Sequence, residues 1–551
     1  MKRTNFLLFI VFPCSILLFS CADTIRKIQV NIEKPELPVL VKKDVNPVLK
    51  IDFVRLDSLP YSVEEIKIST EGTTDLSDIS SISLYGTLEN GQIDTSVQLC
   101  EPQQAAKTVK LRNEILADKD TFSLWVTVSL KDKVQLDHKI NLACIDIKTS
   151  KGKLKFDIPM TSPSRIGVAV RQHNQDGGVH TSRIPGLTIS KNGTLLAIFD
   201  ARYESSRDLQ GHMDIALHRS TDKGVTWQPM QIVLDMGEWG GLPQKFNGVS
   251  DACILADDNS GDLYIAGLWM HGGVLNAETG KWVSGLSEES KEWIHQWRKK
   301  GSQPGFGEKQ TSQFLIAKSS DDGLTWSRPE NITSKTKRKE WWLFAPAPGH
   351  GITLSDGTLV LPTQGRDSRG ESFSNITWSK DKGKTWVTSN PAFSNTTECM
   401  AVELSDGSIM LNMRDSKNRG GNKKTNGRRV AVTTDLGGQT WKEHVTSHNA
   451  LIEPTCMASI HRHRYKENSE EKSILLFVNP NDHSVRDKIT LKVSFDDGMT
   501  WPEDKWILLD QYKSAGYSCI TSVDENTIGI LYESSQANLV FIQIPLSEIL
   551  N

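Results

Sequence analysis

Short runs of alternating apolar and polar residues, separated by turn residues, extend along most of this chain. Clear examples are residues 49–54, which read Leu-Lys-Ile-Asp-Phe-Val, and the runs at 79–84 and 122–130. Alternation of this length is the pattern of a β-strand with one buried face. We therefore predict an all-β protein. Residues 49–157 are predicted to form a small β-sandwich, which could bind carbohydrate or act as a spacer.

One turn motif recurs in the second part of the chain, and we call these turns Asp boxes. The motif reads Ser-x-Asp-x-Gly-x-Thr-Trp at residues 220–227, 319–326, 379–386 and 494–501, and a copy at 433–441 carries one extra residue. In such a turn Asp can accept backbone N–H groups, Gly supplies a positive φ, and Trp can pack against neighbouring chain.

The spacing of the Asp boxes predicts the architecture of this region. Most intervals are roughly 60 residues, which is the length of one four-stranded propeller blade. Residues 158–551 are therefore predicted to form a six-bladed β-propeller, with an insertion at about 271–310 in the longer first interval.

A second kind of turn, between two apolar runs, predicts the first hairpin of several blades. These turns lie at residues 190–193, 355–357, 405–407 and 523–526. In an up-and-down blade, the strand 1–2 turn and the strand 3–4 turn fall on the same face. The start of strand 1, the end of strand 2 and the 2–3 loop fall on the opposite face. Functional side chains are therefore predicted on the face away from the Asp boxes.

The first propeller hairpin directs three polar side chains to that opposite face. Equal steps outward from the turn at 190–193 reach Arg183 and Arg202, which we expect to lie side by side. Asp208 follows in the loop that leads to the third strand.

Later blades direct further polar side chains to the same face. Glu398 and Arg414 lie eight residues on either side of Asp406, and Tyr517 begins the first strand of the last hairpin. Several blades therefore contribute arginines, acids and a tyrosine to one axis.

Two more candidates come from a loop and a hairpin end. Arg486 lies in the 2–3 loop of a later blade, in a stretch where Arg462 and Arg464 are alternatives. Gln364 lies at the site end of its hairpin and is a candidate for contact with a bound ligand.

Composition narrows the class of function. The formal net charge is −3, so no overall positive field would attract nucleic acid. The sequence contains no CxxC pair and no clustered Cys/His spacing, so we predict no metal site and no cofactor. Cys100 and Cys144 could form a disulfide, whereas the cysteines of later strand-like runs are expected to be buried thiols.

The N-terminus has the features of an export signal. Lys2 and Arg3 precede an apolar stretch at residues 6–19, which is typical of a signal peptide over residues 1–20. Leu-Phe-Ser-Cys at 18–21 resembles a bacterial lipobox, which would lipidate Cys21. We expect an exported protein anchored to the outer membrane, on its periplasmic side or at the cell surface, with a tether at 21–48. The alternative is a plain signal peptide.

The propeller sequence resembles the sialidase (neuraminidase) family. Ser-Arg-Ile-Pro at 182–185 matches the Arg-Ile-Pro motif that opens the sialidase propeller, and Asp boxes are typical of its bacterial members. The resemblance covers about residues 160–551. It implies roles for most of these candidates and for Asp251. The implied roles are carboxylate binding (Arg183, Arg414, Arg486), acid/base catalysis (Asp208), a nucleophile pair (Tyr517, Glu398) and contacts to the sugar at its C4 and C5 side (Arg202, Asp251).

These residue types suit the chemistry of a sialic acid. Three guanidinium groups can hold its carboxylate through charge-assisted bonds. A neutral tyrosine avoids the repulsion that a carboxylate nucleophile would meet, and sialidases are known to use tyrosine. The expected activity is retaining exo-hydrolysis of terminal α-linked sialic acids from sialylated glycans, glycoproteins or glycolipids. Two alternatives stay open: a sialic-acid-binding lectin, and a transferase that acts between glycans or within the sugar.

Overall fold

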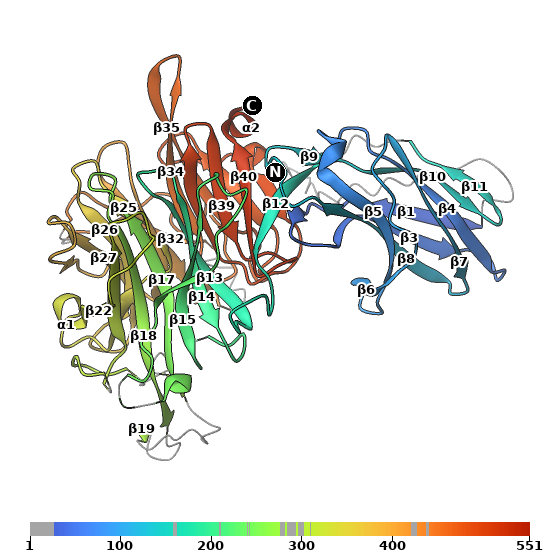
Figure 1. Ribbon diagram of the computed structural model, residues 1–551. Helices are drawn as coiled ribbons and strands as arrows, with labels where there is room; N and C mark the ends of the chain where they lie inside the picture. The colour runs from blue at the N-terminus through green and yellow to red at the C-terminus, as the bar shows by residue number, and fades with distance from the viewer. Residues whose placement is uncertain are drawn as a thin grey trace, which may run out of the picture. The chain divides into compact units, whose positions relative to one another are not determined.

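The computed structural model describes residues 27–551 apart from short segments, which are 158–161, 209–210, 240, 242, 276–281, 284–293, 296–301, 309, 420–426 and 437–439. The chain divides into two compact units, residues 1–166 and 167–551. This division lies close to the predicted boundary between residues 157 and 158. Both units are built almost entirely from β-strands (Figure 1).

The first unit is a sandwich of two antiparallel sheets. The five-stranded sheet has the order β1 (Ile28–Glu33), β3 (Asn46–Arg55), β8 (Thr121–Leu130), β5 (Ile79–Thr87) and β6 (Ile93–Gln98). The four-stranded sheet has the order β11 (Gly152–Lys155), β10 (Ala143–Thr149), β4 (Tyr61–Ser69) and β7 (Thr108–Ala117). The unit also contains β2 (Val39–Val41), β9 (Lys139–Ile140) and a 3-10 turn at Leu76–Asp78.

The predicted tether at 21–48 is wrong for its larger part. β1 pairs along its whole length with β3, with Ile28 opposite Arg55. Asn46, at the start of β3, is fully buried and makes hydrogen bonds to Leu40. Frequent Lys and Pro residues obscure the strand pattern in this stretch, but pairing with the neighbouring strand overrides local composition.

The second unit is a β-propeller, and its described residues form six blades of four strands. The first three blades are β13 (Thr181–Ile189), β14 (Leu195–Arg202), β15 (Met213–Ser220) and β16 (Gln231–Leu234); β17 (Asn247–Ala256), β18 (Leu263–Leu275), β21 (Gln313–Ser319) and β22 (Glu330–Asn331); and β23 (Leu343–Pro346) with β25 (Ile352–Thr353), β26 (Leu359–Arg366), β27 (Ser372–Ser379) and β28 (Val387–Thr388). The other three are β30 (Thr396–Glu403), β31 (Ile409–Asp415), β32 (Arg429–Thr433) and β33 (Lys442–Glu443); β34 (Ser459–Glu467), β35 (Glu470–Pro480), β36 (Ile489–Ser494) and β37 (Ile507–Asp510); and β38 (Ser518–Asp524), β39 (Thr527–Tyr532), β40 (Leu539–Pro545) and β12 (Ser164–Arg171).

The remaining elements are short. They are β19 (Trp282–Val283), β20 (Ile294–His295), β24 (Gly349–His350), β29 (Phe393–Ser394), α1 (Thr333–Thr336), α2 (Leu546–Leu550) and 3-10 turns at Gln244–Phe246, Ser416–Asn418 and Glu503–Lys505. β19 and β20 pair with β18 inside the predicted insertion at 271–310, most of which lies outside the described residues.

The last blade closes the propeller by joining the two ends of the unit. Its three C-terminal strands pair in order, and β12 from the start of the unit pairs with β40, with Gly167 opposite Ile542. This pairing places strands from both ends of the unit in one blade and so closes the ring of blades.

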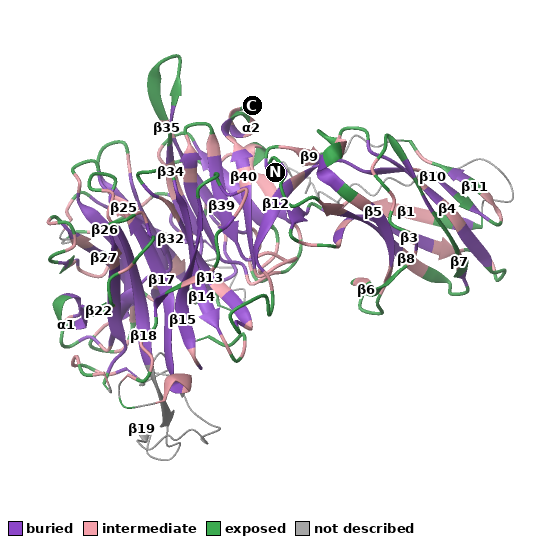
Figure 2. Cartoon of the chain, viewed as in Figure 1, coloured by how far each residue is buried: buried purple, intermediate pink, exposed green. Residues whose placement is uncertain are grey.

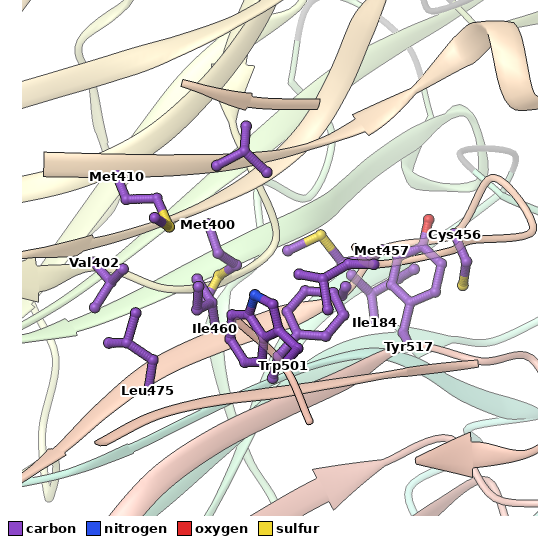
Figure 3. Close-up of a cluster of buried hydrophobic side chains, with 14 residues drawn as sticks. Ile184, Met400, Val402, Met410, Cys456, Met457, Ile460, Leu475, Trp501 and Tyr517 are labelled. Carbon is purple, nitrogen blue, oxygen red and sulfur yellow. The ribbon is translucent and has the colours of Figure 1, made fainter. Parts of the chain in front are cut away.

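Apolar side chains fill the spaces between neighbouring blades, and Figure 2 shows the propeller strands mainly as buried. One such cluster joins β30 and β34 through Met400, Val402 and Ile460. Figure 3 shows Tyr517 and Ile184 at one end of this cluster. The phenol ring of Tyr517 is therefore held by the core.

The Asp boxes have the turn geometry that the sequence predicts. In the four described copies the Asp accepts hydrogen bonds from the backbone N–H and the hydroxyl of Thr, at 2.8–2.9 Å and 2.5–2.6 Å. The Ser of the motif also contributes, because its Oγ accepts the Gly N–H at 2.8–2.9 Å. Part of the fifth copy, at 437–439, lies outside the described residues.

Contacts between turns confirm that the Asp boxes and the first hairpin turns share one face. Asp322 of an Asp box accepts a hydrogen bond from Thr194, which follows a first-hairpin turn, at 2.6 Å. Lys223, in another Asp box, forms an ion pair with Asp524, in another first-hairpin turn, at 2.7 Å. The open ends of the first hairpins therefore lie on the opposite face.

The proposed Cys100–Cys144 disulfide is absent. Both residues, and the other four cysteines that the structure describes, are buried free thiols. Within the described part of the chain, no helix is long and apolar enough to cross a membrane. The signal peptide, Cys21 and the lipobox lie outside the described residues.

Candidate active site

β-bulges interrupt the first strands of three blades where these strands reach the face opposite the Asp boxes. The register shifts lie between Arg183 and Gly186 in β13, between Ser250 and Cys253 in β17, and between Thr396 and Cys399 in β30. A bulge inserts an extra residue and re-aims the side chains beside it. Arg183, Asp251 and Glu398 all lie in or next to these bulges, so three of the predicted site residues depend on them.

The bulge in β13 holds a residue in a costly backbone conformation. Ile184 has φ 60°, in the left-handed region that β-branched residues rarely adopt. Such a conformation costs about 1–3 kcal/mol. Glu533 fixes it, because its Oε1 accepts the Ile184 N–H at 2.9 Å.

The same bulge overturns the expected pairing of Arg183 with Arg202. In the structure Arg183 lies opposite Asp200, and Arg202 lies opposite Thr181. The hairpin is centred on Asn192, and the bulge adds one residue to β13, so the two strands are out of step with the predicted count. Because of this difference in register, the sequence prediction did not include Asp200, which is fully buried beside Arg202.

Tyr517, directly before β38, forms the centre of the site. Its hydroxyl donates to Glu398 Oε1 at 2.5 Å and accepts from Arg414 Nη1 at 3.1 Å. Arg414 Nη1 also donates to Glu398 Oε2 at 2.6 Å. The predicted neighbours Glu398 and Arg414 therefore do lie side by side, on the paired strands β30 and β31.

This environment keeps the phenol protonated in the free protein. Burial raises the pKa of Tyr517 well above its usual value, and the Glu398 carboxylate raises it further, while Arg414 and Arg486 oppose the shift. Ionisation of Tyr517 therefore requires that its proton pass to a base. Glu398, as the direct acceptor of the phenol hydrogen bond, has the position of that base.

Two more arginines flank the phenol ring. The guanidinium carbons of Arg183 and Arg486 each lie 5.5 Å from the ring centroid of Tyr517. Arg183 Nε pairs with Glu533 at 2.5 Å. Although burial disfavours its charged form, Glu533 holds the pKa of Arg183 above its ordinary value. The structure thus brings three of the predicted arginines together around one tyrosine.

Arg486 is the residue that the structure places there among the alternatives in its stretch. Its Nη1 donates to the Ala515 carbonyl at 2.9 Å and its Nη2 to the Thr455 carbonyl at 3.1 Å. Arg462 instead donates to the Glu403 carbonyl at 2.6 Å, and Arg464 lies 3.6 Å from the Glu403 carboxylate. Both of these belong to the Asp-box face.

Arg202 and Asp208 form a second cluster at the site. Arg202 Nη1 donates to Asp208 Oδ1 at 2.6 Å, and its Nη2 donates to Asp200 Oδ2 at 2.9 Å. The Asp208 side chain is 69% exposed, which leaves it accessible to a ligand. Partial burial favours the neutral form, but Arg202 and Arg183 outweigh it and lower the pKa of Asp208.

Asp251 and Gln364 lie together beside this cluster. Asp251 has φ 53° in the β17 bulge, and Gln364 Nε2 lies 3.5 Å from its Oδ2. Burial raises the pKa of Asp251 well above its usual value, with added repulsion from Glu398 and Asp200. Among the residues that the structure describes, no donor reaches the buried Gln364 Oε1, so this atom is available to accept a hydrogen bond.

The comparisons with known proteins agree with this geometry. Residues 184–516 match the model of the BNR repeat-like domain, and residues 27–153 match that of the N-terminal domain of BNR-repeat neuraminidase. A sialidase from Bacteroides fragilis (strain YCH46) is 37% identical over 98% of both chains. The chain belongs to the BNR-repeat sialidases, a family of glycoside hydrolases.

Other relatives cover different shares of this sialidase. A sialidase from Micromonospora viridifaciens is 32% identical over 65% of the chain and 50% of its own length. The solved structure of a Hadza microbial sialidase matches with a TM-score of 0.82 and 33% identity, over 94% of this chain and 99% of that one. The latter match extends to nearly the whole chain, the N-terminal sandwich included.

The sequence prediction for the sialidase site did not include Glu533, although a signal was present. Glu533 N–H donates to the Tyr517 carbonyl, and Glu533 Oε2 accepts the Tyr517 N–H at 2.9 Å, so the two residues are opposite each other in the last hairpin. Counting eight residues outward from Glu525, in the turn, along both strands reaches Tyr517 and Glu533, so a count along both strands rather than one would have found it.

The site of this sialidase offers donors for an anion and no assembled set of metal ligands among its described residues. Two groups of three acidic or histidine side chains occur elsewhere: Asp75, Asp78 and His138 in the sandwich, and His212, Asp214 and Asp235 in the propeller. Neither group contains a predicted site residue. The arginine-rich chemistry at Tyr517 suits a carboxylate ligand.

Proposed function

We propose that this sialidase is an exo-enzyme that hydrolyses terminal α-linked sialic acids from glycoconjugates with retention of configuration, using Tyr517 as nucleophile. The observation that carries the proposal is the 2.5 Å hydrogen bond between Tyr517 and Glu398 among three arginines. A tyrosine that is buried, protonated and paired with a carboxylate is a nucleophile poised for activation.

Substrate binding begins with the anion. A sialic acid carries a carboxylate on its anomeric carbon C2. Arg414 contacts the Tyr517 hydroxyl, and the guanidinium groups of Arg183 and Arg486 flank the Tyr517 ring. Bidentate charge-assisted bonds would orient the sugar with C2 beside the phenol oxygen. Asp251 and Gln364 are placed to contact other polar groups of the sugar.

In the first chemical step the Tyr517 oxygen attacks C2 and its proton passes to Glu398. The bond between C2 and the aglycone oxygen breaks, and Asp208 donates a proton to the leaving oxygen. The negative charge of Glu398 raises the pKa of Tyr517 in the free protein, and this charge is neutralised when Glu398 accepts the proton.

In the second step water attacks C2 from the aglycone side and Asp208 takes its proton. The bond between C2 and the Tyr517 oxygen breaks, and Glu398 returns the proton to the phenol. Two inversions at C2 give net retention, so the first product is the α-anomer.

The experiment that tests this scheme follows cleavage of a fluorogenic sialoside by the wild type, Tyr517→Phe and Asp208→Ala, with the released sugar observed by NMR. We expect free sialic acid as the α-anomer, and loss of at least a hundredfold in kcat for Tyr517→Phe. First release of the β-anomer, or near wild-type activity of Tyr517→Phe, would contradict the proposal.

The same NMR experiment decides between the alternatives. Release of an anhydro sugar identifies intramolecular transfer, and formation of new sialosides identifies transfer between glycans. Binding of sialoglycans without cleavage identifies a lectin. The intact set of Tyr517, Glu398 and Asp208 supports hydrolysis over the lectin, because a lectin needs none of these reacting groups.

We also propose that the protein is exported and lipid-anchored through Cys21. The charged and apolar N-terminal residues followed by Leu-Phe-Ser-Cys support this. Cell fractionation of Cys21→Ser should move the enzyme from the membrane to the soluble fraction, whereas retention on the membrane would contradict the anchor.

A further inference from the structure

Asp200 is a buried carboxylate that the scheme above leaves without a role. Its side chain, in β14, is completely buried. Its Oδ2 accepts hydrogen bonds from Arg202 Nη2 at 2.9 Å and from Ser250 Oγ at 2.8 Å. Burial of an ionised carboxylate is costly unless a partner charge compensates, so the Arg202 contact is what permits Asp200 to be charged.

The same guanidinium also holds the proposed acid. Arg202 Nη1 donates to Asp208 Oδ1 at 2.6 Å and to the Ser206 carbonyl at 2.8 Å. One buried arginine, 1% exposed, therefore bridges a carboxylate in the core and a carboxylate at the open site. Its positive charge is divided between the two.

We propose that Asp200 is a positioning residue that acts through Arg202 to keep Asp208 able to carry the proton for the leaving group. This inference rests on the proposed role of Asp208 as acid. If the Asp200 charge is removed, the charge of Arg202 acts on Asp208 alone, and the ionised form of Asp208 becomes more favourable. A general acid that has lost its proton cannot assist departure of a sugar alcohol.

Other charged groups face this pair from neighbouring strands and loops. Asp208 faces Arg183 from β13 and Arg486 from the loop between β35 and β36, and both favour its ionised form. Asp200 faces Asp251 from β17, which in turn faces Glu398. Asp200 is nevertheless the carboxylate that shares a guanidinium with Asp208 by direct contact, so its effect on Asp208 should be the most specific.

The titration of Asp200 defines where the effect should appear. Burial raises the pKa of Asp200 to about 6, despite the opposing contacts with Arg202 and Ser250. Asp200 is therefore neutral below this pH and charged above it. The charged form, which opposes ionisation of Asp208 through the shared guanidinium, is therefore present only above about pH 6.

The test compares kcat/KM of the wild type and Asp200→Asn as a function of pH on two substrates. Sialyllactose has a sugar alcohol as leaving group and needs the acid, whereas a 4-methylumbelliferyl sialoside has an acidic leaving group and needs it little. For sialyllactose, we expect the alkaline limb of the profile of kcat/KM against pH to move down by about one pH unit in Asp200→Asn. At pH 7.5 the loss should be about tenfold larger for sialyllactose than for the aryl sialoside. Below pH 6 the two proteins should converge.

A matched control lies on the Asp-box face, where Asp322 of the second blade contacts residues of the first blade. Asp322 accepts hydrogen bonds from Arg219 at 3.0 Å and from Thr194 Oγ1 at 2.6 Å, an analogous arrangement of acid, arginine and hydroxyl. Asp322→Asn should leave the pH limb and the ratio between the substrates unchanged. If Asp200→Asn does not fold, Ser250→Ala removes one contact that favours ionised Asp200 and should move the limb in the same direction by less.

Two further results separate the possible failures. Equal losses on both substrates with an unmoved alkaline limb in Asp200→Asn would overturn the inference and leave Asp200 a structural residue. Asp208→Ala should itself lose more activity on sialyllactose than on the aryl sialoside. If it does not, the proposed role of Asp208 fails; if it does and Asp200→Asn does not, only this inference fails.

Discussion

At the scale of single residues, one buried carboxylate organises much of the candidate site. Glu533 accepts the Arg183 guanidinium and the backbone N–H groups of Ile184 and Tyr517. It thereby links the first and the last blade of the propeller at the point where the proposed nucleophile, Tyr517, and Arg183 meet. Every charged group in this network has a partner, which offsets the free-energy cost of burying its charge.

The geometry of Arg183 leads to a prediction for its conservative replacement. Arg183→Lys keeps the charge but loses the planar fork, so it cannot pair with Glu533 and hold a substrate carboxylate at once. We expect KM for a sialoside to rise by roughly tenfold or more. Arg462→Lys, on the Asp-box face, is the control and should leave KM unchanged. Equal KM values for the wild type and Arg183→Lys would contradict the proposed role of Arg183 in binding the sialic acid carboxylate.

At the scale of elements, the turns were predictable and the strand registers were not. The Ser-x-Asp-x-Gly-x-Thr-Trp pattern determines a local turn, because its hydrogen bonds lie within the motif itself. The pairing of Arg183 depends on a bulge that no local residue announces, since Ile184 adopts φ 60° only where Glu533 holds it. The hairpin of Glu398 also has a bulge, yet its two predicted partners still meet.

The Asp boxes also make contacts between blades, which leads to a prediction about glycine. Gly224 has φ 92°, and a Cβ there would lie 2.1 Å from Phe541 of the last blade. Gly193 has φ 84° in open space. Both Gly→Ala changes incur the backbone cost of about 1–2 kcal/mol. Gly224→Ala should lose about 1–3 kcal/mol more through overpacking. Chemical denaturation measures both, and equal losses would argue against a tight contact between these blades.

At the scale of the whole propeller, strands from several blades line an open cavity of about 390 Å³ on the Asp-box face. The rings of His350 and His461, from the third and fifth blades, lie 5.6 Å apart in its wall. Burial lowers the pKa of His350 to about 4 and that of His461 well below its usual value. These histidines are neutral in the folded protein but titrate near 6.5 when it unfolds.

This difference predicts that the enzyme loses stability in acid. Between the folded and the unfolded pKa the unfolded chain binds more protons, so stability falls as pH decreases from about 6.5 toward 4. For His350 the loss between pH 7.5 and pH 5 is about 2 kcal/mol. Denaturation of His350→Gln at both pH values should show a smaller acid loss than the wild type by about that amount. An unchanged difference would mean that His350 titrates normally.

The sequence by itself determined the fold class, the number of blades and the face that carries the candidate site. These follow from local patterns: alternation gives strands, the Asp boxes give turns at a regular interval, and strand direction alternates through a blade. The resemblance to sialidases then added roles for Arg183, Glu398 and Tyr517. Counting residues from each turn was sufficient to assign Arg183, Glu398 and Tyr517 to that face, although not to fix their strand partners, because hairpin strands are close in the chain.

Only the tertiary structure decided the contacts of Asp200 and Glu533. Asp200 meets Ser250 of the neighbouring blade. Glu533 meets Arg183 where β12 closes the ring, which brings together segments more than three hundred residues apart in the chain. The same holds for the strands of the sandwich before residue 49, which exist because β3 pairs with β1. Long-range pairing of this kind depends on the whole chain, and no local pattern encodes it.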